Sequence, residues 1–210
     1  SAWPMIMHLD NKDNVGPKSI SGKEDWRRQK KEPATINENH ARELMELHTI
    51  SPDGGYTQED VIELAKIMTG WRPKWTKGRE HGHDVSFDRE IHEPGKKKVL
   101  GKVYKSGKKG IKLAINDLVN HPSCREFIST KLCKYLITDN PTPEMIAPVI
   151  KAWEKSDGLL PEVHKAAIKV AFEYNDKYKK FQNPENWWLT TINMSAVSYT
   201  HLTLPTRRGV

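Results

Sequence analysis

The stretch that decides the fold is Asn37–Trp71, which reads NENHARELMELHTISPDGGYTQEDVIELAKIMTGW. Apolar residues recur in it every three or four positions in two runs, which is the spacing of amphipathic helices. The sequence Asp-Gly-Gly at 53–55 separates the runs and indicates a turn. Thr57 and Asp60 have the spacing of a capping box, and Gly70 suits the left-handed position that ends a helix. The stretch therefore predicts two helices joined by a glycine turn.

The first of these helices is predicted to begin with Asn37 or Asn39 as its cap and to run to about Thr49. Its apolar spacing places Leu47 and His48 on the inner side, so we expect His48 to be a partly buried, hydrogen-bonded histidine rather than a metal ligand.

The helical period is lost in two places, before and after this stretch. Residues 11–33 are polar and aperiodic, and they are predicted to form a long surface loop. Between 72 and 110, the pieces Val85–Phe87 and Val99–Tyr104 alternate in polarity and predict a small hairpin or two short extended segments.

Helical spacing then returns for the rest of the chain. One helix is predicted from Ile111 to Pro122 with Ile115 inward, and the next begins with Ser123 as its cap. Further helices are predicted from Pro143, after Gly158 and from Pro184. The fold class is therefore all-α, a multi-helix orthogonal bundle with a small basic hairpin-like insertion at 72–110.

Both ends of the chain break the pattern. Val197–Thr206 reads VSYTHLTLPT, which the end of a widely used transposase-based sequencing adapter encodes in one reading frame, and the next bases account for the final residues. At the other end, Ser1 opens inside an apolar helical pattern. We therefore expect residues 196–210 to be translated adapter and residues 1–195 to be a fragment of one helical domain.

The composition is that of a globular chain of 210 residues with 36% hydrophobic and 29% charged residues, which excludes a disordered or fibrous protein. The two cysteines, Cys124 and Cys133, are nine positions apart in one predicted helix, so they cannot form a disulfide with each other. No apolar run approaches the 20 or so residues that a membrane-spanning helix needs.

Positive charge is concentrated in one segment. The formal net charge is +7, but Arg72–Lys112 alone holds 13 Lys and Arg against 5 Asp and Glu, an excess of +8, so the rest of the chain carries −1. Such a segment can attract phosphate, carboxylate or sulfate groups or an acidic protein partner. The alternative is a solvated, lysine-rich hairpin without a partner. Nucleic acid is not favoured.

Two sets of residues carry candidate chemistry. Asn39, Glu43 and Glu46 recur on one face of the first helix with Arg42 beside them. The two glutamates repel each other unless a cation balances them, so they form either a metal or acid/base site or an ion-paired lattice with Arg42.

The second set lies in the insertion, where potential metal ligands are dense. His83, His92 and Glu93 are the candidates for a divalent metal, because a hairpin could bring the two histidines together. Their spacing matches no specific zinc pattern, and histidines in a lysine-rich loop are commonly just solvated.

The chain resembles the bacterial domain-of-unknown-function family 1800. The resemblance rests on LDN at Leu9–Asn11, NENHARELMELHT at Asn37–Thr49 and DGGYTQEDVIELAKIMTGW at Asp53–Trp71, and it continues through His92-Glu93 and Leu100-Gly101. The chain departs from the family pattern at Glu93, where the family tends to have aspartate, and at Ser51-Pro52. The resemblance implies no established activity. It implies that many members are exported, which would place this protein outside the bacterial cytoplasm.

Two functional hypotheses follow. The first is a non-enzymatic helical protein that binds an anionic partner through its basic insertion, with Asn39, Arg42, Arg72, Lys97 and Lys98 as binding residues. The second is a hydrolase or transferase that uses Glu43, Glu46 and His92 as metal ligands or as acid/base groups.

Overall fold

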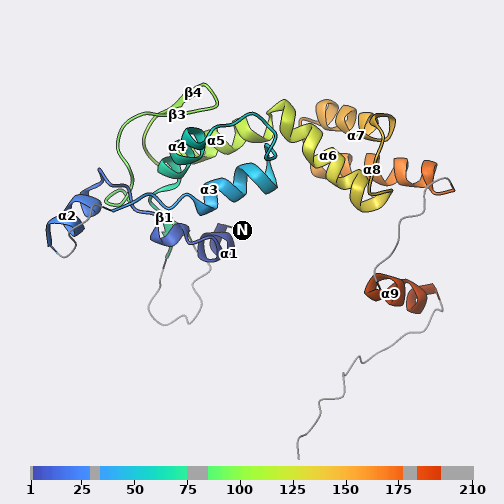
Figure 1. Cartoon of the computed structure of the whole chain (residues 1–210), viewed down its shortest axis with the longest axis horizontal. Coiled ribbons are helices and arrows are strands. Elements are labelled where there is room, and N and C mark those ends of the chain that lie inside the picture. The colour runs from blue at the N-terminus through green and yellow to red at the C-terminus, as the bar shows by residue number, and fades with distance from the viewer. Residues whose placement is uncertain (1, 29–33, 75–84, 177–183, 195–210) are drawn as a thin grey trace, which may run out of the picture.

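The computed structural model describes residues 2–28, 34–74, 85–176 and 184–194, and within these ranges the chain is mostly helical (Figure 1). The helices are α1 (Ala2–His8), α2 (Ile20–Arg28), α3 (Asn39–Glu43), α4 (Gln58–Met68), α5 (Lys109–Val119), α6 (Pro122–Leu136), α7 (Pro143–Ser156), α8 (Leu160–Tyr174) and α9 (Pro184–Met194). The strands are β1 (Trp71–Pro73), β2 (Val85–Phe87), β3 (Lys97–Val99) and β4 (Lys102–Tyr104). This content confirms a helical fold with a small hairpin insertion. None of the described helices is long and apolar enough to cross a bilayer.

The described core consists of two separate clusters of buried side chains. The first is built by α3, α4, β3, β4 and α5 around Met45, Leu64 and Leu118. The second is built by α6, α7 and α8, which lie together at the other end of the molecule in Figure 1. Val119 at the end of α5 packs against the second cluster, and Lys131 Nζ of α6 donates to Leu47 O at 3.0 Å. Among the described residues, the two halves therefore meet at α5 and through this hydrogen bond.

Both cysteines lie inside the second cluster as free thiols, so the prediction that they do not pair is confirmed. Burial raises the pKa of Cys124 to about 11, which keeps its thiol protonated and unreactive at neutral pH.

Helix α4 is the centre of the first cluster, and its predicted start and stop are both confirmed. Thr57 and Asp60 form a reciprocal capping box, in which Asp60 N donates to Thr57 Oγ1 at 3.2 Å and Thr57 N donates to Asp60 Oδ2 at 2.9 Å. Gly70 takes a φ of 91°, a backbone conformation that residues other than glycine rarely adopt. The chain can therefore leave α4 sharply and enter β1.

Helix α3 continues into a π-helical turn, η2 (Leu44–His48), that the sequence did not predict. A π-helical turn holds more residues than an α-helical one, so the side chains that follow it are rotated away from the face that α-helical spacing predicts. Leu47 is 48% exposed and His48 is exposed as well, so their predicted inward placement was wrong. The predicted cap at Asn37 or Asn39 was wrong, because α3 begins at Asn39 and its N-cap is Glu38, which makes no side-chain capping bond. Asn37 lies one position before the cap, and its Oδ1 accepts from Asn39 N at 3.1 Å.

The insertion contains two antiparallel ladders instead of a single hairpin. Strand β1 pairs with β2 in the register Trp71↔Phe87, and β3 pairs with β4 in the register Lys97↔Tyr104. The second ladder is a tight hairpin, because Leu100 and Gly101 have φ values of 48° and 79°, as a two-residue type I′ turn requires.

The prediction of a surface loop over residues 11–33 was wrong for residues 11–28, and its last five residues lie outside those that the structure describes. The segment contains η1, a 3-10 turn (Asn11–Asp13), and α2, and both Asn11 and Asn14 are buried. Asn11 Nδ2 donates to Trp71 O at 2.9 Å, and Asn14 Nδ2 donates to Ala65 O at 2.9 Å. These amides satisfy backbone carbonyls at and beyond the end of α4, a role that hydrophobic periodicity cannot reveal.

Two predictions about α5 and α6 also need correction. Ile115 was expected to point inward but is 40% exposed. Helix α6 is capped by His121, not by Ser123, because Ser123 N donates to His121 Nδ1 at 3.3 Å and Pro122 takes the first helical position. The backbone N–H of the first helical residue has no partner within the helix, so proline, which lacks this N–H, can begin α6.

Candidate functional site

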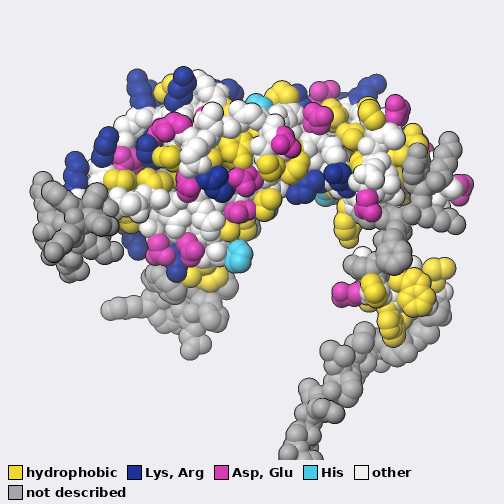
Figure 2. Space-filling model, viewed as in Figure 1, with side chains coloured by type: hydrophobic (Ala, Val, Ile, Leu, Met, Phe, Trp, Pro, Cys, Tyr) yellow, Lys and Arg dark blue, Asp and Glu magenta, His cyan; other side chains and the backbone are white. Residues whose placement is uncertain are grey.

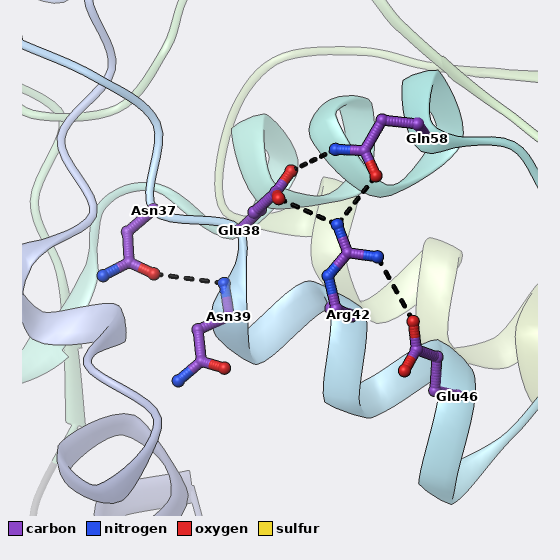
Figure 3. A network of polar contacts seen from close by, with 6 residues as sticks. All are labelled: Asn37, Glu38, Asn39, Arg42, Glu46 and Gln58. Carbon is purple, nitrogen blue, oxygen red and sulfur yellow. Dashed lines mark hydrogen bonds and ion pairs between the residues drawn. The ribbon is translucent and has the colours of Figure 1, made fainter. Parts of the chain in front are cut away.

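Asn39, Glu43 and Glu46 form the polar stripe that the sequence predicted, and one of them, Glu46, belongs to an ion-paired network centred on Arg42 (Figure 3). The Arg42 guanidinium donates to Glu38 Oε1 at 2.8 Å, to Glu46 Oε1 at 3.2 Å and to Gln58 Oε1 at 2.7 Å. Hydrogen bonds first to Glu38 and then to Glu46 raise the pKa of Arg42. Burial raises the pKa of Tyr56, and a hydrogen bond to Glu46 raises it further. The negative charge of Glu46 is therefore balanced by Arg42, and its carboxylate is also hydrogen-bonded to Tyr56.

The other two members of the stripe take no part in this network. Asn39 is exposed, and Figure 3 shows its side-chain amide pointing away from Arg42. Glu43 is half-buried and has no hydrogen bond or ion pair to another described residue. The arrangement corresponds to the ion-paired alternative, and the paired glutamates are Glu38 and Glu46.

His92 lies at the end of α4, where backbone groups engage both of its ring nitrogens. Its Nδ1 donates to Thr69 O at 2.8 Å, and its Nε2 accepts from Gly107 N at 2.9 Å. Burial lowers the pKa of His92, so the ring is neutral at physiological pH. This pattern fixes the tautomer and leaves no free ring nitrogen for proton transfer or for a metal.

Glu93 and Lys97 form a buried polar cluster beside His92. Glu93 is 5% exposed; its backbone N donates to Thr69 Oγ1 at 2.8 Å and its Oε2 accepts from Lys18 N at 2.9 Å. Lys97 is 2% exposed and its ammonium donates to Glu93 O, while burial lowers its pKa. Lys97 is thus an interior residue and does not present its charge to a partner.

The candidate residues that the structure describes are not assembled into one catalytic or metal centre. Within the described residues, no hydrogen bond or ion pair connects Glu43 or Glu46 to His92, and no three His, Cys, Asp or Glu residues gather as a metal site. His83 lies outside the residues that the structure describes. Of the surface cations that were predicted to bind, Arg72 pairs with Asp88 at 3.5 Å and Lys98 is exposed.

A pocket of about 540 Å³ lies where the insertion meets the start of α2. We call it the basic pocket. Its lining residues are Lys18, Ser19, Ile20, Lys23, Phe87, Arg89, His92, Pro94, Ser106 and Gly107. No acidic side chain is among these lining residues, and its three cations, Lys18, Lys23 and Arg89, are exposed and have no ion pair to any described carboxylate. The pocket therefore presents unbalanced positive charge.

Backbone hydrogen bonds hold the two walls of the basic pocket together. Gly16 N donates to Ile91 O and Ser21 N donates to Glu90 O, each at 2.9 Å. A Cβ atom at Gly16 would lie 2.6 Å from the backbone of Glu93, so only glycine permits this close approach. Together with the bond from Lys18 N to Glu93, these contacts hold the segment that carries Lys18 against the segment that carries Arg89.

The sequence did not predict the contribution of Lys18 and Lys23. They fall in the segment that was expected to be a loop, and their pairing with a segment 70 or so positions away leaves no periodic signal. Figure 2 shows other Lys and Arg side chains along the edge over β3 and β4, where the charge excess of the sequence had placed them.

Comparison with known proteins identifies the family of this chain. The family model described as "Protein of unknown function (DUF1800)" matches residues 3–207. The match extends past Ser195, where we expected the native sequence to end, into residues outside those described. No curated protein and no solved structure gives a significant match. Since the family model covers nearly the whole chain, the protein belongs to the DUF1800 family of proteins of unknown function.

Proposed function

We propose that this protein binds an anionic ligand, and that the basic pocket is the binding site. The observation that supports this most strongly is the meeting of Lys18, Lys23 and Arg89 around one concavity with no acidic side chain in its lining. Exposed cations are normally interspersed with anions, and the residues that line the basic pocket include none. An oxyanion would provide the missing balance.

The chemistry of the pocket favours a phosphate, sulfate or carboxylate group. Arg89 offers a planar fork of donors that fits two oxygens at once, and Lys18 and Lys23 add mobile ammonium donors. The hydroxyl of Ser106 lies at the same rim, but it donates to Glu93 O at 3.3 Å and so adds no donor for an anion. The rings of Phe87 and His92, with centroids 5.0 Å apart, form an aromatic wall that excludes water from one side.

The catalytic alternative gains no support from the geometry. Glu46 is engaged by Arg42, and His92 has both ring nitrogens bonded, so neither group is available to accept a proton from a substrate. The proposal also includes an extracytoplasmic location, which the family resemblance suggests and which fractionation of bacterial cells that produce the native protein would test.

Binding of small oxyanions by titration calorimetry tests the proposal. Pyrophosphate, sulfate and citrate serve as probes at low and at physiological ionic strength. We expect at least one to bind and to weaken as salt is added, since exposed charges are screened over about 8 Å at physiological salt.

A charge-matched pair of variants locates the site. Lys18→Glu with Arg89→Glu should weaken binding at least tenfold, which corresponds to about 1.4 kcal/mol. The control, Lys151→Glu with Lys165→Glu, makes the same charge change at exposed positions on α7 and α8. Equal losses in both variants would reduce the effect to net charge and contradict the basic pocket, and so would binding of none of the three probes.

A further inference from the structure

A second concavity, of about 770 Å³, lies between α1, α3, η2, β1 and α5, and most of its surface is apolar. We call it the apolar groove. Its lining residues are Met5, Ile6, Asn11, His40, Leu44, His48, Met68, Trp71, Lys108, Lys109, Ile111, Lys112 and Ile115. It shares no lining residue with the basic pocket, so the two are distinct sites. Its size and lining are those of pockets that bind small apolar molecules.

The apolar walls explain the unexpected exposure of Ile115. Helical spacing places Ile115 with the core residues Ala114 and Leu118, yet it is 40% exposed while they are 1% and 2% exposed. It faces the groove together with Ile111 of the same helix and Leu44 of η2. An isoleucine left in water in this way is stabilised when an apolar molecule covers it.

One rim of the apolar groove is cationic. Lys108, Lys109 and Lys112 line it from the start of α5, no acidic residue is among its lining residues, and the first turn of α5 contains none either. Lys108 Nζ lies 6.0 Å from the centre of the Trp71 ring, which holds it over the groove wall. These lysines carry the positive charge of the groove, because burial and then the neighbouring His48 lower the pKa of His40 to about 4.

Two polar atoms of the lining residues are buried without a partner. Trp71 Nε1 and His40 Nδ1 have no hydrogen bond to any described residue. A buried polar atom without a partner costs about 1–3 kcal/mol, so such atoms in a native protein call for an explanation. Both atoms lie buried in the wall of the apolar groove, where the described residues leave them unsatisfied.

We propose that the apolar groove binds a single-chain fatty carboxylate. Its hydrocarbon chain lies along Leu44, Ile111 and Ile115, and its carboxylate meets the ammonium groups of Lys109 and Lys112. This ligand matches both halves of the groove, because apolar walls alone would accept an alcohol equally well and lysines alone would accept any anion. The inference stands apart from the basic pocket and needs none of its residues.

Titration calorimetry with decanoate, at a concentration below that at which it forms micelles, tests the inference. Decanol and decyltrimethylammonium have the same chain with no charge and with the opposite charge. We expect decanoate to bind at least tenfold more tightly than decanol and decyltrimethylammonium to bind least. Equal binding of decanoate and decanol would contradict the role of the lysines.

Two aspartate substitutions on α5 provide a matched pair. Ile115→Asp should weaken decanoate binding at least tenfold, because it places a carboxylate in the apolar wall. Leu113→Asp should leave binding unchanged, because Leu113 lies on the same helix, is 57% exposed and does not line the groove. Both positions face solvent, so both variants should keep the circular dichroism spectrum of the parent protein.

Further variants separate this inference from its alternatives. Lys109→Glu with Lys112→Glu should weaken decanoate but not decanol. The Lys18→Glu, Arg89→Glu protein should bind decanoate normally, so loss of decanoate in that protein would contradict a separate site. Sedimentation without ligand gives a further test: a dimer that Ile115→Asp abolishes would make a second copy of the chain the occupant and would overturn the proposal.

Discussion

Replacing Asn14 with aspartate should destabilise the protein strongly and in a pH-dependent way. Asn14 is fully buried, and its Nδ2 donates to Ala65 O at 2.9 Å and to Asn11 Oδ1 at 3.3 Å, while its Oδ1 accepts from Asn37 N at 3.1 Å. Aspartate has nearly the same shape and keeps the bond from Asn37. It loses both bonds that Nδ2 donates and places a negative charge against two oxygens.

The size of the effect follows from these contacts. Two lost hydrogen bonds cost about 1 kcal/mol each, and a buried charge without a partner adds at least about 1 kcal/mol, so we expect the free energy of unfolding to fall by about 3 kcal/mol at pH 7. Burial among carbonyl oxygens raises the pKa of the new carboxyl in the folded state above its unfolded value of about 3.9. The loss should therefore be smallest at and below about pH 4 and should grow as the pH rises.

Urea unfolding followed by tryptophan fluorescence between pH 4 and pH 7 measures the effect. Asn39→Asp is the matched control, because Asn39 is exposed at the start of α3, where a negative charge is tolerated. A loss below about 0.5 kcal/mol at pH 7, or an equal loss in the control, would show that Asn14 does not hold the end of α4.

Three other outcomes are expected. Gly101→Val should lower the free energy of unfolding by about 1–2 kcal/mol in the same assay, because a φ of 79° strains a β-branched residue. A Cβ at this position would meet no other atom, so the cost comes from the backbone conformation alone. Gly101→Asn should cost less, since asparagine tolerates this conformation better. Tyr104→Phe should lower the free energy of unfolding by about 1 kcal/mol, because it removes the 2.8 Å hydrogen bond to Asp117 Oδ2. Hydrogen bonds from Lys102 and then Tyr104 lower the pKa of Asp117, so NMR titration of the variant should show this pKa move up toward its ordinary value. An unchanged pKa of Asp117 would contradict the bond. His40, with a pKa lowered to about 4, contributes stability that is complete above about pH 6.5 and is lost as the pH falls toward 4. Proton NMR should give this low pKa for His40 in the free protein and a higher pKa in the presence of decanoate. An unchanged pKa would place the carboxylate of decanoate away from His40.

The parts of the fold that sequence could predict are those that local chemistry determines. The start of α4 at Thr57 and its end before Gly70 were both predicted, because a capping box and a glycine at a helix end depend only on residues a few positions apart in the sequence. The helices from Pro143 and Pro184 follow for the same reason.

What could not be predicted depends on distant partners. Asn11 and Asn14 look like loop residues until the carbonyls that they satisfy, more than 50 positions away, are known. The π-helical turn changes which side of the helix Leu47 faces, and helical spacing cannot anticipate it. The candidate site was displaced for the same reason: charge density pointed to the insertion, but Lys18 and Lys23 join it only through backbone pairing, and Lys97 turns inward.

The separation of the core into two clusters determines how the molecule comes apart. Met45 and Leu64 belong to one, Cys133 and Val149 to the other, and α5 is the helix that touches both. Heat or denaturant need not melt both halves at once, since the hydrophobic contacts of one lend little support to the other. Whether a calorimeter records one transition or two rests on the few side chains near Val119.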